Sequence, residues 1–263
     1  MKSLKSITAG LVGSAVLFSA VAMPAFAATS AQPLPAAKPA PVASAQNPQA
    51  KGVVVTSKII QQKTAEYEAN ITIPVISGLK DKAFEAKLNA DLLKYAQDQL
   101  KERQTMSKQD AIDSKKYGYP MRPHAVDISY KVISVGKLVS FSVQTYLYTG
   151  GAHGLTDMTY YNIANLDKAK NLQLSDLFQA GYDYRYVLNN LIKQQIKNNP
   201  EIADVYNFET IAENQPFSFE NGNLVIHFTQ YEIAPYAAGM PAFSIPVHSY
   251  LNLLKPEVKA LLQ

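Results

Sequence analysis

The chain has 263 residues, of which 47% are hydrophobic and 17% charged, and this composition can bury the core of one large domain or two small ones. It contains no cysteine, which excludes a disulfide framework, a cysteine zinc site and a thiol nucleophile. The net charge is +4 at pH 7 and falls to +2 without the first 27 residues, which is too small to indicate a nucleic acid as partner.

Residues 1–27 have the pattern of a signal peptide. Lys2 and Lys5 form a short positive region, an apolar stretch follows, and Ala25-Phe26-Ala27 fits the small-residue rule for signal peptidase. The apolar stretch is shorter than the roughly 20 apolar residues of a spanning helix and is diluted with small ones, which favours cleavage over an uncleaved membrane anchor. We therefore expect an exported protein, secreted or periplasmic in the bacterial cell envelope, with no transmembrane segment after cleavage.

Residues 28–51 are rich in alanine and proline and carry almost no large apolar side chain. Such a segment cannot bury enough surface to offset its chain entropy. We expect a disordered spacer of partly polyproline character.

The segment 53–149 has the pattern of an α+β module. Alternating apolar residues predict strands at 53–60 and 67–76, and apolar residues at helical spacing predict an amphipathic helix over 81–104. A looser charged segment and a turn at 117–123 follow. Two more strands are predicted at 124–135 and 137–148, joined by Gly136-Lys137.

The segment 150–263 predicts a second module of similar size. It contains an alternating strand at 155–163, a helix from about Asp183 to Asn198, a hairpin turning at Asn221-Gly222, a final strand at 242–247 and a C-terminal helical piece. This order predicts an α+β fold of mostly antiparallel sheets, with helices packed on one face and two similar-sized halves meeting near residue 150.

The stretch YLYTGGAHGLTDMTYYN, residues 146–162, combines glycines with a lone histidine and several tyrosines. A phosphate cradle needs glycines that follow a strand and open a helix. Here a strand pattern follows, and no Lys-Ser/Thr pair is present. The glycines therefore indicate a turn between two strands, with positive φ at Gly150 or Gly151.

No motif points to catalysis, a cofactor or a metal. None of the four histidines pairs with another at metal-ligand spacing, and His153 and Asp157 would lie about 13 Å apart along a strand. There is no GxSxG nucleophile elbow. Paired carboxylates leave no sequence signature, so a glycan hydrolase stays open as an alternative. The carboxylates considered for it include Asp127, Asp157, Asp176, Glu209, Glu220 and Glu232.

All 16 tyrosines lie after residue 27, and there is no tryptophan. Several flank the Gly-Gly turn or the irregular stretch YEIAPYAAGMP, residues 231–241. Tyrosine joins a rigid apolar body to a polar tip, which suits recognition surfaces. The alternative is that these rings cover a sheet face and cap the core. The candidate binding residues are Tyr146, Tyr148, Gly150, Gly151, His153, Tyr231 and Tyr236.

Three stretches, YLYTGGAHG, LSDLF and FTQYEIAPYAAGMPAFSIP, occur in this order. Together they resemble the extracytoplasmic domains of RsiV-type anti-sigma factors and the N-terminal part of PdaC-type peptidoglycan deacetylases. The resemblance covers about Val53 to Ser249. Its first half is similar to the deacetylase-associated module, and its second half to the domain that binds lysozyme in RsiV-type proteins.

The sequence shows neither the sigma-binding segment nor the polysaccharide deacetylase domain of those families. The resemblance therefore implies a non-enzymatic binding or sensor module, with lysozyme or a cell-wall glycan as ligand. A hydrolase and a purely structural envelope protein stay open.

Overall fold

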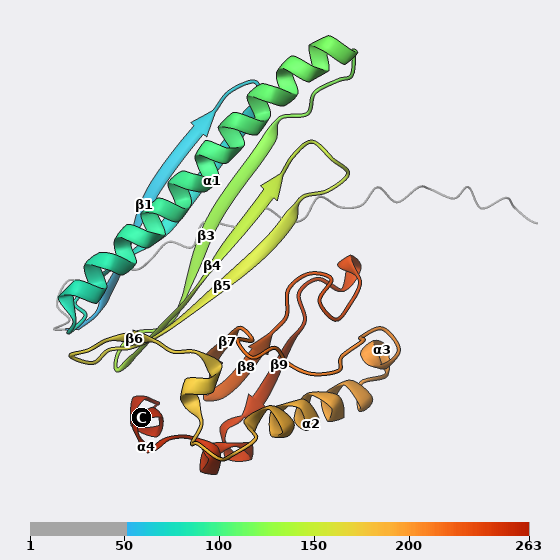
Figure 1. Cartoon of the computed structure of the whole chain (residues 1–263). Coiled ribbons are helices and arrows are strands. Elements are labelled where there is room, and N and C mark those ends of the chain that lie inside the picture. The colour runs from blue at the N-terminus through green and yellow to red at the C-terminus, as the bar shows by residue number, and fades with distance from the viewer. Residues whose placement is uncertain (1–51, 263) are drawn as a thin grey trace, which may run out of the picture. The chain divides into compact units, whose positions relative to one another are not determined.

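The computed structural model describes residues 52–262. The expected signal peptide and spacer lie outside the described residues. Within them the chain forms a six-stranded sheet, a three-stranded sheet and the helices that pack on them (Figure 1). The expected α+β class is confirmed. No helix between residues 52 and 262 is both long and apolar enough to cross a membrane.

The six-stranded sheet keeps its strands in chain order. Neighbouring strands are antiparallel except β2 and β3, which pair in parallel over Tyr67–Ile71 because the helix α1 connects them. The strands are β1 (Val54–Lys63), β2 (Tyr67–Ser77), β3 (His124–Ser134), β4 (Leu138–Tyr148), β5 (Leu155–Ala164) and β6 (Lys170–Asn171).

Helix α1 (Lys82–Tyr117) is longer than the sequence predicted. The Asp81 side chain caps its start by accepting a hydrogen bond from the Phe84 backbone N–H at 3.0 Å, and Gly118 ends it with φ of 75°. The prediction of a loose segment after residue 104 is wrong, because the helix continues to Tyr117. Neither glycine nor proline interrupts residues 105–117, and their lysine, glutamine and alanine favour a helix although they show no apolar stripe.

The first core lies between α1 and the six-stranded sheet (Figure 1). Leu88, Leu92 and Ala96 on the helix are buried against Ile71 of β2 and the cluster that includes Phe141 of β4. The first half of β4 is buried on both faces, since Ser140 and Ser142 are as inaccessible as the apolar residues that alternate with them, Val139, Phe141 and Val143. A second layer of protein therefore covers the face that α1 leaves free.

The three-stranded sheet is antiparallel throughout. The β7–β8 turn has φ of 51° at Asn221 and 78° at Gly222, as the dipeptide predicts for a tight hairpin. Leu188 and Ile192 of α2 are buried in the core that covers this sheet. The strands are β7 (Phe217–Glu220), β8 (Asn223–His227) and β9 (Ala242–Pro246). The helices are α2 (Tyr184–Lys197), α3 (Pro200–Ala203) and α4 (Pro256–Leu261), with 3-10 turns η1 (Leu174–Leu177), η2 (Tyr236–Ala238), η3 (Val247–Ser249) and η4 (Leu251–Leu253).

Buried polar groups connect the two sheets. The Asn162 side chain on β5 accepts a hydrogen bond from Ser140 Oγ at 2.8 Å and donates one to the Phe217 carbonyl of β7 at 2.7 Å. The first sheet itself continues through β5 and β6 to Asn171. The proposed division into 53–149 and 150–263 therefore places the last two strands of this sheet in the second module.

Candidate functional site

The turn between β4 and β5 needs glycine at one of the two expected positions. Gly150 has φ of 86°, which side chains rarely adopt, whereas Gly151 has no positive φ and its added Cβ would meet nothing within 4 Å. The Gly151 carbonyl accepts hydrogen bonds from Tyr148 Oη at 2.9 Å and Arg122 Nη1 at 3.1 Å. Tyr148 therefore holds the turn in shape.

A third glycine in this turn, Gly154, has a steric role that sequence reasoning missed. A Cβ at this position would lie 2.4 Å from the Cε2 and Cζ atoms of Tyr146, so only glycine lets that ring rest on the backbone. The Gly154 carbonyl also accepts a hydrogen bond from Tyr236 Oη at 3.3 Å. The feature of the sequence that could have indicated this role is the third glycine, at the end of the GGAHG stretch.

The structure brings the two tyrosine-bearing stretches together. The His153 ring stacks on Tyr236 with centroids 4.2 Å apart, and Tyr231 lies 5.6 Å from Tyr236 by the same measure. With Tyr146 beneath Gly154, these side chains form one cluster from the β4–β5 turn and the β8–β9 connection. We call Tyr146, His153, Tyr231 and Tyr236 the aromatic face.

Tyr231 is the most unusual member of the aromatic face. It is one of two non-glycine residues between 52 and 262 with positive φ, at 67°, and its side chain is 57% exposed. A bulky residue in this conformation costs roughly 1–3 kcal/mol, and such strain is concentrated at functional sites. An exposed ring gains little burial to offset that cost.

The aromatic face is suited to contact rather than acid–base chemistry. Burial raises the pKa of Tyr146, the charges of Tyr236, Asp127 and Tyr148 act in the same direction, and a hydrogen bond from the Gly154 backbone opposes them. The Tyr146 phenol is therefore neutral at pH 7. The face offers stacking surface and hydrogen-bonding hydroxyls.

Three of the carboxylates considered for a hydrolase are held by local partners. Asp127 accepts a hydrogen bond from Asn70 at 2.8 Å, Asp176 pairs with Lys170 at 2.6 Å, and Glu232 accepts from the Thr229 backbone at 2.7 Å. Within residues 52–262, no group of three or more histidine, aspartate or glutamate side chains is placed to hold a metal ion. Local partners therefore account for these three carboxylates in structural terms.

Comparison with known proteins finds a different family match in each half of the described chain. Residues 60–156 match the family model described as deacetylase PdaC, and residues 175–248 match the protein family of unknown function DUF3298. The anti-sigma-V factor RsiV of Bacillus subtilis (strain 168) is 29% identical over 214 residues, which cover 75% of this chain and 69% of RsiV.

Two solved structures share the fold. A DUF3298 family member from Bacteroides fragilis NCTC 9343 superposes with a TM-score of 0.65 at 21% identity, covering 81% of this chain and 99% of its own. A DUF3298 family protein from Pseudomonas aeruginosa PAO1 gives a TM-score of 0.51 at 18% identity, and the match covers 78% of this chain and 95% of that protein's chain.

The chain thus contains one segment that matches the PdaC family model and a later one that matches the DUF3298 model, and the expected resemblance is confirmed. Its named relative is an anti-sigma factor, which is consistent with a binding or sensor module that is not an enzyme, although the first family takes its name from a deacetylase. The aromatic face draws on both matched segments.

Proposed function

We propose that this chain is an exported binding or sensor module of the cell envelope, and that its aromatic face recognises a protein ligand, with lysozyme the first candidate. The signal-peptide pattern and the spacer support the location. The observation that carries the proposal is the exposed Tyr231, held at φ of 67° beside Tyr236 and His153. Rigid aromatic side chains supply contact area at low entropic cost.

Charge supports a cationic protein as the ligand. Residues 172–262 contain nine acidic and five basic side chains, a net charge of −4, whereas the chain as a whole is +4. Charge of opposite sign steers association and disfavours wrong partners. A cationic lysozyme would be complementary in charge to this half of the chain.

The test is a titration of the whole chain with lysozyme, comparing native protein with His153→Ala, Tyr231→Ala and Tyr236→Ala. Replacing a residue that dominates an interface costs about 2 kcal/mol, or roughly thirtyfold in affinity. Tyr186→Ala is the matched control, because Tyr186 is 65% exposed on α2 and lies outside the aromatic face.

Melting curves of the same variants separate binding from folding. If all three face variants stay folded and bind lysozyme as the native chain does, the aromatic face is not the site. If all three unfold, these rings are structural struts.

A second candidate ligand, a cell-wall glycan, has one observation in its favour. A cleft of about 240 Å³ between β5 and the segment before β7 is lined by side-chain amides, including Asn171, Gln173 and Asn214. Amides that both donate and accept hydrogen bonds suit sugar hydroxyls. If Asn214→Ala weakens binding to purified peptidoglycan while Tyr231→Ala does not, the ligand is a cell-wall glycan and this cleft binds it.

A further inference from the structure

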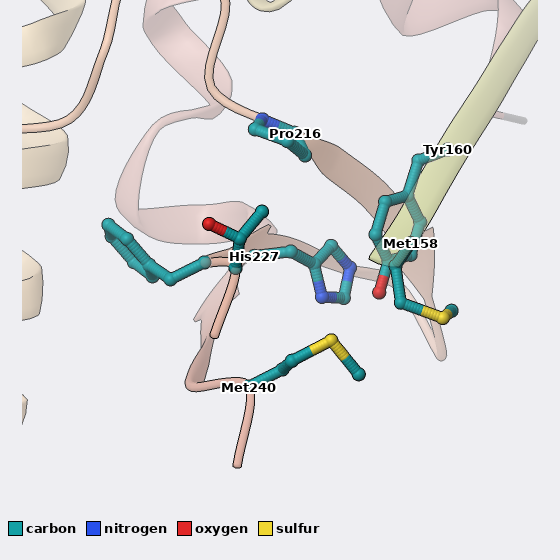
Figure 2. Close-up of a pocket in the computed structure, with 7 residues that line it drawn as sticks. Met158, Tyr160, Pro216, His227 and Met240 are labelled. Carbon is teal, nitrogen blue, oxygen red and sulfur yellow. The ribbon is translucent and has the colours of Figure 1, made fainter. Parts of the chain in front are cut away.

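A second, smaller pocket has a chemistry that the proposed function does not use. It is lined by residues that include Met158, Tyr160, His227 and Met240 (Figure 2). Its volume is about 20 Å³, which is enough for one water molecule or one monatomic ion.

The fold explains how these residues meet. Met158 and Tyr160 are two positions apart on β5, so their side chains leave the same face of the strand. His227 ends β8, and Met240 lies just before β9. Figure 2 shows the His227 ring directed toward Tyr160 and the Met240 sulfur next to the imidazole, whereas the Met158 thioether lies on the Tyr160 side and is turned away from His227.

A hydrogen-bond chain fixes the tautomer of His227. Its Nε2 lies 2.8 Å from Ser218 Oγ, which donates its single proton to Glu220 Oε1 at 2.8 Å. The other Glu220 oxygen lies 3.6 Å from Lys131 Nζ, which keeps the carboxylate ionised and accepting. Ser218 Oγ must therefore accept from Nε2–H, and Nδ1 of His227 keeps a free lone pair.

Stacking also fixes the orientation of the ring. Tyr160 lies against it with centroids 3.8 Å apart and planes 10° apart. The ring plane is therefore held by Tyr160 while the Ser218 hydrogen bond holds its Nε2 edge.

We propose that His227, Met158 and Met240 form a binding site for one soft monovalent cation, Cu(I) or Ag(I). Thioethers select soft metals, and imidazole suits copper. All three ligands are neutral, which favours a monovalent over a divalent ion. The Ser218–Glu220 chain is the outer support that metal-binding histidines characteristically have. Methionine has three rotatable bonds, so both thioethers can close on an ion in the small pocket.

The test titrates the full chain with Ag(I) in chloride-free buffer and follows bound metal by native mass spectrometry and calorimetry. One ion should bind per chain and raise the melting temperature. Met158→Leu and Met240→Leu preserve side-chain volume and should fold normally. Each should weaken silver binding about tenfold or more, at least the loss that removing an outer-shell partner causes.

Met121→Leu is the control, because Met121 does not line this pocket, and it should bind silver as the native chain does. An excess of Zn(II) should not displace the silver. The proposal is overturned if the Met158→Leu/Met240→Leu double variant binds silver as tightly as the native chain, or if Met121→Leu weakens binding equally. Should a leucine variant fold poorly, methyl NMR of the native chain decides, because silver must shift the Met158 and Met240 signals and leave that of Met121 in place.

Discussion

Replacing Gly154 by alanine tests whether the aromatic face is held together as described. The backbone at Gly154 has no positive φ, so alanine meets no conformational barrier there. Its Cβ, however, would lie 2.4 Å from two ring carbons of Tyr146. Carbon atoms pack best at about 3.5–4.0 Å, so the ring must move by more than about 1 Å.

Moving the Tyr146 ring disturbs the carbonyl that holds Tyr236 and, through it, the stack with His153. Overpacking of this kind costs about 1–3 kcal/mol. For a folded chain of this size that corresponds to a fall in melting temperature of about 2–12 °C. Lysozyme affinity should fall with it, because the face loses its arrangement.

The assay is a double-mutant cycle with Tyr146→Leu, which removes the ring atoms that the new Cβ would meet. Gly154→Ala should cost less in the Tyr146→Leu background than in the native one, giving a favourable coupling energy. Gly151→Ala is the matched control, since nothing lies within 4 Å of its added Cβ. An unchanged melting temperature for Gly154→Ala, or costs that simply add in the cycle, would refute this account of the turn.

Gly150→Val should lower the free energy of unfolding by about 1–2 kcal/mol or more, while Gly151→Val should leave it nearly unchanged, because of the two only Gly150 has positive φ. Equal denaturation midpoints for the two variants would contradict this. Tyr231→Gly should raise the melting temperature by relieving strain yet weaken lysozyme binding, and a loss of stability would show that the ring supports the fold. Between pH 6.5 and about 4 the unfolded chain takes up a proton at His227 that the folded chain does not. The free energy of unfolding should therefore decrease as the pH is lowered, by up to about 3 kcal/mol. The stability advantage of the native chain over His227→Gln should therefore shrink across that range in urea titrations.

Local patterns predicted the elements of the fold well where side chains are buried on one face. The alternation along residues 67–76 and the Asn221-Gly222 dipeptide each gave a strand or turn that the structure has. The last third of α1 was not predicted, because residues 105–117 have no apolar stripe. Its helical state follows from uninterrupted helix-forming residues and the Gly118 cap, which leave no periodic signal.

The residue types of the candidate site could be predicted from the sequence, whereas their arrangement in space could not. Glycines, a histidine and tyrosines marked two stretches, but nothing local says that His153 stacks on Tyr236, which lies in the other half of the chain. The choice between Gly150 and Gly151 depends on a backbone angle, and the role of Gly154 on a ring folded back from β4. The methionine pocket also joins residues that are far apart in the sequence, Met158 and Met240. Taken alone, each of these methionines has the pattern of an ordinary core residue.

The two proposed sites share one connection of the chain, and this predicts a thermodynamic link between them that can be measured. His227 and Met240 stand at the two ends of the segment that carries Tyr231 and Tyr236. An ion bound by both ends would order this segment before a ligand arrives, so ligand binding at the aromatic face would cost less conformational entropy. Linkage then requires lysozyme to raise silver affinity by the factor by which silver raises lysozyme affinity. Lysozyme titrations with and without one equivalent of silver test this, and equal affinities in the two titrations would mean that the segment is already ordered without the ion.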